Sequence, residues 1–263
     1  MEEKRADAEI KVQNGFIKWL DNFWYHYKWP TIGVTLAAIV LAVCLWQTAT
    51  TDKYDMLVVY AGRTSLTVDQ TDQLATVLEH IMPEDYDGDG KKNVSMNMYH
   101  IYSADQIKEI EASTDSEGVR GQVDRHFITT QKEAYNNYMM TGDASICFLE
   151  PWLYEEIGKE YLCPLSEIFG DELPASAIDG YGIRLGDTDL YRDYGALRRL
   201  PADTVICLQT PFLSESFLSR KGDSKKFEFE KSVLSAIALY ESENAADATD
   251  VQSEMTLKDD DDQ

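Results

Sequence analysis

The distribution of apolar and polar residues divides the chain into one long uncharged segment near the N-terminus and a region of alternating strand and helix patterns. Residues 29–51 contain no charged side chain. At a rise of 1.5 Å per residue, a helix of this length spans about 35 Å, enough to cross a bilayer core of about 30 Å. Lys28 and Asp52 bound the segment, and Trp29 and Trp46 stand where interfacial anchors are common. The pattern predicts one transmembrane helix.

Three other interpretations of this segment stay open at the sequence level. A cleaved secretory signal has a short basic leader, whereas about thirty residues precede this segment. Leu41–Cys44 is similar to a bacterial lipobox, although Val43 stands where a small residue is usual. A buried core helix is the third interpretation, and such a helix seldom lacks charge over this length.

The residues before the uncharged segment predict an amphipathic helix that lies in the membrane interface. Aromatic and leucine side chains recur there at helical spacing, and the pattern ends at Trp29–Pro30, where proline disfavours a helical residue before it. Lysines lie closer to this end of the span than to the other. The positive-inside rule then places residues 1–28 in the cytoplasm and the main domain outside the cell.

Beyond the span, strand and helix patterns alternate. A continuous apolar run at 55–61 is typical of a buried strand, and Thr67 with Gln70 forms a candidate capping box before a helix that Pro83 ends. Further strands are expected at 94–102, 144–149, 181–185 and 205–208, and further helices at 122–141, 151–157 and 229–240. This alternation predicts an α/β domain with a mainly parallel sheet and flanking helices.

The domain organisation follows from these patterns. We expect a cytoplasmic or interfacial segment at 1–28, the transmembrane helix at 29–51 and an extracellular α/β domain at 52–243. Residues 244–263 are rich in acids and predict a disordered tail. The polar stretch 105–121 predicts a loosely structured connection.

Charge and cysteines limit the classes of function. The net charge is −23, and the excess of acids lies after residue 52, because residues 1–28 hold five basic and five acidic side chains. So negative a surface repels nucleic acid and favours cationic partners. Besides Cys44 in the apolar segment, Cys147, Cys163 and Cys207 have no metal-binding spacing, which favours buried thiols, while a single Cys163–Cys207 or Cys147–Cys207 bridge stays open.

An acidic loop is the clearest local motif. Acids at Asp85, Asp87 and Asp89 are followed by Gly90, as in the first half of an EF-hand calcium loop. Two further ligands would be the carbonyl of Lys91 and the side chain of Asn93. Met96 stands where an EF-hand has a bidentate glutamate, and a strand pattern follows instead of a helix, so the motif predicts either a non-EF-hand calcium loop or a metal-free acidic turn.

One part of the chain resembles a known family. Thr141–Ile157, followed by Leu162–Phe169, is similar to a stretch of bacterial extracellular solute-binding proteins of the type 2 periplasmic-binding fold. The aromatic segment 23–30, the single span and the Asp-Gly-Asp-Gly-Lys turn also resemble uncharacterised single-pass surface proteins of Gram-positive bacteria. The resemblance implies a periplasmic-binding-like fold, but the residues from Lys53 to Ser242 suffice for a single lobe and not for a two-lobed clamp.

The sequence therefore predicts a non-enzymatic, membrane-anchored binding domain. No hydrolase, phosphate-loop, dinucleotide or zinc-protease motif is present in the chain. A ligand would be expected at the carboxyl ends of the strands, where Arg63, Thr64, Glu150 and Trp152 follow two strand patterns. The alternative is a structural or protein-interaction module of the cell envelope that binds no small solute, with an envelope protein or cell-wall component as its partner.

Overall fold

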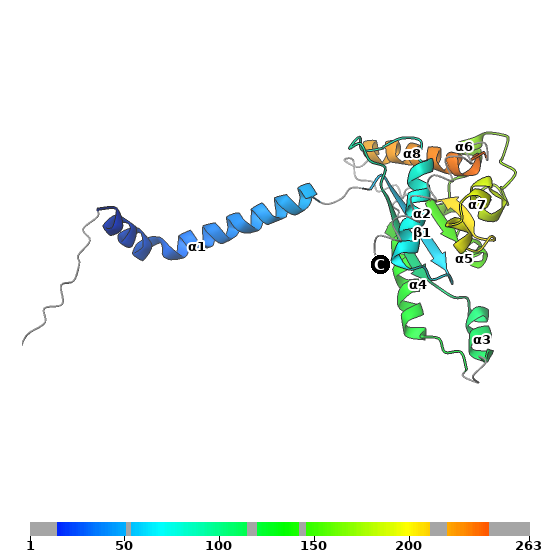
Figure 1. Ribbon diagram of the computed structural model, residues 1–263, viewed down its shortest axis with the longest axis horizontal. Coiled ribbons are helices and arrows are strands. Elements are labelled where there is room, and N and C mark those ends of the chain that lie inside the picture. The colour runs from blue at the N-terminus through cyan, green and yellow to red at the C-terminus, as the bar shows by residue number, and fades with distance from the viewer. Residues whose placement is uncertain (1–14, 51–53, 115–119, 142–145, 211–219, 242–263) are drawn as a thin grey trace, which may run out of the picture. The chain divides into compact units, whose positions relative to one another are not determined.

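A computed structural model describes residues 15–50, 54–114, 120–141, 146–210 and 220–241 (Figure 1). The chain forms two compact units, residues 1–52 and 53–263. The acidic tail expected at 244–263 and the first fourteen residues lie outside the described residues.

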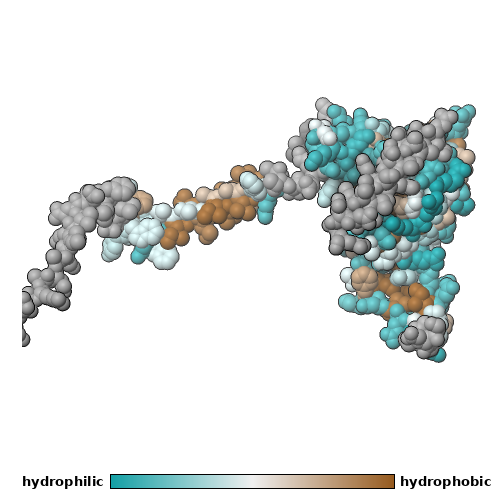
Figure 2. All heavy atoms as spheres, viewed as in Figure 1, coloured by the Kyte–Doolittle hydropathy of each residue, from teal (hydrophilic) through white to brown (hydrophobic). Residues whose placement is uncertain are grey.

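The described part of the first unit is the helix α1, which spans Gly15–Thr50. Its stretch Tyr27–Gln47 has a mean hydropathy of 2.0 and no buried side chain, so it is long and apolar enough to cross a membrane, as a signal sequence near the N-terminus would also be. Figure 2 shows hydrophobic residues along the middle of this helix between more hydrophilic flanks. The expected break at Trp29–Pro30 is wrong, because the helix continues through Pro30. Proline removes only one backbone donor, a loss that a long apolar helix tolerates.

The second unit contains a mixed α/β structure with a five-stranded sheet in its described part. The strands are β1 (Met56–Gly62), β2 (Val94–His100), β3 (Ile146–Leu149), β4 (Ile183–Arg184) and β5 (Val205–Leu208). Their order is β2-β1-β3-β5-β4. β1 pairs in parallel with β2 and β3, whereas β5 is antiparallel to both β3 and β4. The predicted sheet is therefore confirmed as α/β, but it is mixed around β5.

Helices and short helical turns connect and cover these strands. The helices are α2 (Val68–Ile81), α3 (Ala104–Ala112), α4 (Arg125–Thr141), α5 (Pro151–Glu156), α6 (Ser166–Phe169), α7 (Asp189–Asp193) and α8 (Arg220–Ala238), and the 3-10 turns are η1 (Lys159–Tyr161), η2 (Leu185–Asp187) and η3 (Leu197–Arg199). The capping box of Thr67 and Gln70 at the start of α2 is confirmed. The loosely structured connection expected at 105–121 is wrong over its first part, because α3 forms there behind a second capping box, made by Ser103 and Gln106.

The two faces of the sheet pack against different helices. Along β1, Met56, Val58 and Tyr60 belong to the core that includes α2 and α8, whereas Val59 and Ala61 belong to the core that includes α4 and α5. Alternate side chains of a strand point to opposite faces, which explains this division. α3 has no buried residue and lies away from the sheet in Figure 1.

Candidate functional site

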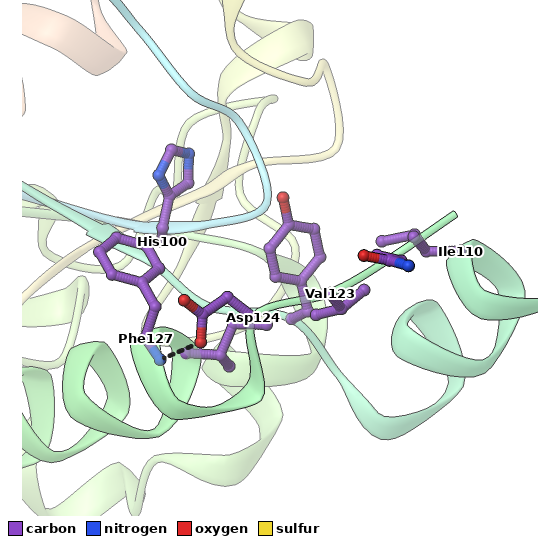
Figure 3. A pocket seen from close by; sticks show the side chains of 8 residues that line it. His100, Ile110, Val123, Asp124 and Phe127 are labelled. Carbon is purple, nitrogen blue, oxygen red and sulfur yellow. Dashed lines mark hydrogen bonds between the residues drawn. The ribbon is translucent and has the colours of Figure 1, made fainter. Parts of the chain in front are cut away.

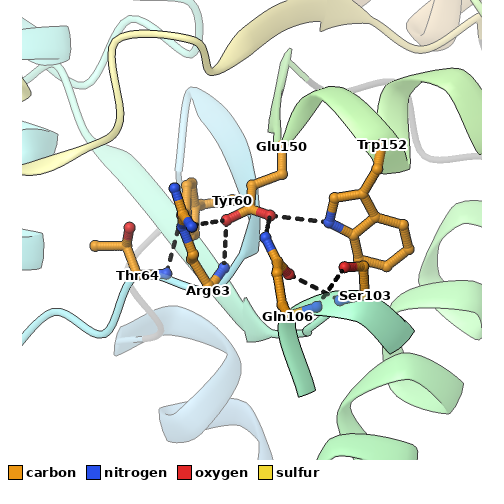
Figure 4. A network of polar contacts seen from close by, with 7 residues as sticks. All are labelled: Tyr60, Arg63, Thr64, Ser103, Gln106, Glu150 and Trp152. Atoms are coloured by element: carbon orange, nitrogen blue, oxygen red, sulfur yellow. Dashed lines mark hydrogen bonds and ion pairs between the residues drawn. The ribbon is translucent and has the colours of Figure 1, made fainter. Parts of the chain in front are cut away.

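The carboxyl ends of β1 and β3 bring three of the four predicted ligand-binding residues together. Arg63 directly follows β1, and Glu150 and Trp152 directly follow β3 and begin α5. The two strands are parallel neighbours, so their carboxyl ends lie side by side. Figure 4 shows Arg63 and Trp152 directed toward the carboxylate of Glu150 from opposite sides.

Glu150 is only 3% exposed, and protein groups occupy both of its carboxylate oxygens. Its Oε1 accepts a hydrogen bond from the backbone N–H of Arg63 at 3.0 Å and forms an ion pair with Arg63 Nε at 3.3 Å. Its Oε2 accepts from Trp152 Nε1 and from Gln106 Nε2, each at 2.8 Å. A buried carboxylate with this many donors is held in one place and has little capacity left for a solute.

Sequence analysis missed Gln106, although its position three residues after Ser103 is the spacing of a capping box. The Gln106 side-chain oxygen accepts from the Ser103 N–H at 2.8 Å, which leaves its amide nitrogen free to donate to Glu150. Gln106 therefore ties the exposed helix α3 to the sheet. The signal was present in the sequence, whereas the contact with Glu150 depends on the fold.

Thr64, the fourth predicted residue, contacts a different group. Its backbone N–H donates to the Tyr60 hydroxyl at 3.2 Å, and burial raises the pKa of that hydroxyl. Gly62 allows this close packing, because a Cβ there would lie 2.7 Å from the Tyr60 hydroxyl and 2.8 Å from Glu150 Cγ. The arrangement locks the end of β1. The Arg63 side chain is half-exposed, and its two terminal guanidinium nitrogens are available to bind an anion.

The acidic loop between α2 and β2 is organised by its own carboxylates. Asp85 accepts from the N–H groups of Gly88 and Gly90 at 2.8 and 2.7 Å. Both glycines have positive φ, 74° and 88°, so the expected role of Gly90 in a tight turn is confirmed. Hydrogen bonds from backbone amides, that of Gly90 first, hold the pKa of the exposed Asp85 carboxyl below its usual value. The loop therefore presents an ionised carboxylate at neutral pH.

A buried residue outside the motif, Asp55, anchors this loop. Asp55 immediately precedes β1 and is 1% exposed. Its Oδ1 accepts from the N–H groups of Tyr86 and Asp87 at 3.0 and 3.1 Å, and its Oδ2 accepts from the Asn93 N–H at 2.8 Å. The sequence placed Asp55 at the start of a strand but could not show which loop it meets.

The group of acids that could hold a cation differs from the predicted set. Oxygen atoms of Asp55, Asp85 and Asp87 lie within 4.8 Å of one another. Asp89 is outside this group, and its Oδ1 accepts from the Lys91 N–H at 2.8 Å. Calcium prefers such oxygen ligands, but backbone hydrogen bonds already use these carboxylates. The calcium loop and the metal-free acidic turn therefore both remain predictions.

Calcium at about 10 mM is expected to raise the melting temperature of the full chain in detergent by about 3–6 °C. The shift is modest because a loop without a bidentate glutamate should bind calcium with a dissociation constant of about 10⁻⁴–10⁻³ M. Asp87→Ala should abolish the shift. Asp89→Ala is the matched control and should keep most of it, because Asp89 lies outside the converging group. An unchanged melting curve of the unmutated chain would identify the loop as a turn only.

Two hollows lie on the α4 face of the domain. A small one, about 200 Å³, lies between the end of β2, α3 and the start of α4 (Figure 3). Asp124 there accepts from the Phe127 N–H at 2.9 Å, and His100 Nε2 has no partner among the described residues. This volume is below the range of typical ligand pockets, about 300–1,000 Å³.

The larger hollow is an open groove of about 550 Å³ between α4 and the α5–η1 segment. Its lining is mostly apolar, and we name it the α4–α5 groove, lined by Tyr135, Asn136, Met139, Met140, Leu153, Glu156, Ile157, Gly158, Tyr161 and Gln209. Two rim residues, Met140 and Tyr161, are 77% and 48% exposed. The groove was not predicted from the sequence, because it requires α4 and η1 to lie side by side.

Comparisons with protein-family models, with curated proteins and with solved structures give no match to this chain.

Proposed function

We propose that this protein is a non-enzymatic binding domain of the cell envelope, anchored by α1 in the cell membrane with its N-terminus in the cytoplasm and its acidic α/β domain outside. Its fold would correspond to one lobe of a periplasmic-binding-like protein. It contacts a folded partner and does not enclose a small solute. The observation that carries this choice is the Glu150 network, in which protein donors already occupy both carboxylate oxygens.

A single sheet in the described part of the domain also supports a partner over an enclosed solute. Small-molecule pockets usually bury most of the ligand surface, which a clamp of two lobes achieves by closing. Residues 53–263 cluster as one compact unit. A solute at Arg63 would therefore keep much of its surface in water, whereas a folded partner can use a wide and shallow contact.

The α4–α5 groove is the surface that we assign to the partner. Protein interfaces draw most of their affinity from a few apolar or aromatic side chains that fill a hollow. The groove offers this kind of hollow, and Met140 and Tyr161 extend its apolar surface outward. The net charge of −23 favours a cationic partner, with an association that weakens as salt is added.

A photocrosslinking amino acid in place of Tyr161 is expected to trap one defined envelope protein or cell-wall component on intact cells. The same amino acid in place of Leu173, which is also exposed at 43%, is the matched control and should trap nothing. Met140→Glu should abolish the adduct at position 161, because it adds a charge to the apolar rim. Added salt should lower the yield.

The outcome that would contradict the proposal is a small-molecule ligand. Thermal-shift screens with sugars, amino acids and short peptides are expected to give no strong stabilisation. A micromolar ligand that requires Arg63 or Trp152 would restore the solute-binding interpretation. Equal crosslinking at positions 161 and 173 would overturn the assignment of the partner to the α4–α5 groove.

A further inference from the structure

Two cysteines face each other across neighbouring strands in the core of the domain. Cys147 in β3 and Cys207 in β5 are directly opposed in the antiparallel register. Both are fully buried, and their thiols are in hydrogen-bonding contact. Directly opposed residues of an antiparallel pair have Cα atoms about 4.5–5.5 Å apart, which lies within the 4.4–6.8 Å range of disulfides. The register therefore gives this pair the backbone spacing that a bridge requires.

The third cysteine of the domain cannot compete for this bridge. Cys163 belongs to the core on the α2 and α8 side of the sheet, together with Leu208, whereas Cys147 and Cys207 belong to the core on the α4 and α5 side. Because a strand's successive side chains alternate between faces, the body of the sheet separates Cys163 from Cys207. Burial also raises the pKa of the Cys163 thiol to about 11, so it stays protonated and unreactive.

We propose that Cys147 and Cys207 are joined by a disulfide in the mature protein, an inference that rests on the extracellular placement given under the proposed function. Secreted and surface proteins mature where disulfides form and persist. The oxidant is a small or protein disulfide. One cysteine thiolate attacks the oxidant, forms a mixed disulfide and releases one thiol of the oxidant. The second thiolate then attacks the protein sulfur of that mixed disulfide, which forms the Cys147–Cys207 bond and releases the other thiol of the oxidant. The oxidant thus leaves as two thiols, having taken up two electrons and two protons.

The bridge forms while the domain folds. In the native domain both sulfurs are inaccessible, beneath Tyr135 of α4 and Leu153 of α5. The neighbouring Cys147 thiol, together with burial, raises the pKa of Cys207, so Cys207 holds almost no thiolate in the native domain. Oxidation must therefore precede the docking of α4 and α5, and once formed the bridge is protected from reductants.

The bridge would link β5, which is antiparallel to both of its neighbours, to β3 at the centre of the sheet. It closes a loop of about 60 residues that includes α5, η1 and β4, so it holds one wall of the α4–α5 groove to β3. Closing a loop of this length restricts the unfolded chain substantially. The bridged domain should consequently melt about 10 °C above the reduced one.

The test counts thiols in the full chain. The chain is extracted from membranes and unfolded in the presence of N-ethylmaleimide, which labels each free thiol. Its mass is measured by mass spectrometry, and the labelled chain is then digested without reductant. Two maleimides, on Cys44 and Cys163, and a peptide pair linked through Cys147 and Cys207 are expected. Cys163→Ala is the matched control and should keep the link with one maleimide, whereas Cys207→Ala should show three. Four maleimides on the unmutated chain, or a link through Cys163, would overturn the proposal.

Refolding in vitro tests whether the disulfide can form independently of where the domain lies in the cell, and so distinguishes a failure of this proposal from a failure of the proposed function. Reduced full chain, unfolded in urea and detergent, is refolded with oxidised and reduced glutathione, where the same link should form whatever the location in the cell. Failure to link, with the domain outside the cell by protease digestion, overturns the disulfide alone. A link formed on refolding together with four free thiols in cells overturns the disulfide in the mature protein and the extracellular placement with it.

Discussion

Glu150→Ala is expected to lower the free energy of unfolding by about 3 kcal/mol and the melting temperature by about 6–12 °C, as measured by urea and thermal denaturation of the full chain. The substitution leaves the N–H of Arg63, the amide of Gln106 and the indole N–H of Trp152 without their acceptor. These hydrogen bonds are partly buried, so donors that lose their acceptor there keep the cost of desolvation without the gain of the bond, which accounts for most of the loss.

The matched control is Glu155→Ala, on the same helix α5. Glu155 is exposed, so its removal should change the free energy of unfolding by no more than about 0.5 kcal/mol. Glu150→Gln should lie between the two, since the amide keeps one acceptor oxygen but loses the charge that strengthens each bond. Equal stability of the alanine variants at 150 and 155 would mean that the network contributes nothing to the fold.

Protease added to intact cells is expected to digest the domain beyond residue 52 completely and to spare residues 1–28. The reason is the uncharged length of α1 together with the lysines before it, which the positive-inside rule keeps in the cytoplasm. Fragments are identified by mass spectrometry. Permeabilised cells are the control, in which both regions should be digested.

Other fragments would support the alternative interpretations of the apolar segment. A soluble domain with a new N-terminus near residue 50 would identify a cleaved signal. A new N-terminus at Cys44 that carries a lipid would identify a lipoprotein. Protection of the whole chain in intact cells, with digestion after permeabilisation, would place the domain inside and reverse the orientation.

Local patterns were sufficient for most elements of the domain. β5 occupies the predicted residues 205–208, and α2 begins behind the predicted capping box of Thr67 and Gln70. Both depend on interactions among near neighbours, namely an apolar run and a hydrogen-bond pair three residues apart. α3 carries the same kind of signal at Ser103 and Gln106, so its omission was an error of interpretation and not a limit of the sequence.

The direction of β5 was beyond such patterns. An apolar run of four residues is compatible with a parallel or an antiparallel central strand, because both bury each face. The connection between β4 and β5 contains η2, α7 and η3, and only this folded segment returns the chain antiparallel to β4. Likewise Pro30 predicts the end of an isolated helix, and only the complete apolar helix shows that its remaining hydrogen bonds outweigh the missing one.

Taken by itself, the sequence determined one apolar helix of membrane length, an acidic α/β domain, and the residue that ends β3, because these follow from composition and from periodicity along the chain. Tertiary structure alone decided that Gln106 completes the Glu150 network, that Asp55 anchors the acidic loop, and that Cys147 opposes Cys207 while Cys163 lies on the other face. Each of these joins residues more than 30 positions apart. Such contacts depend on strand order and register, which many distant residues set together.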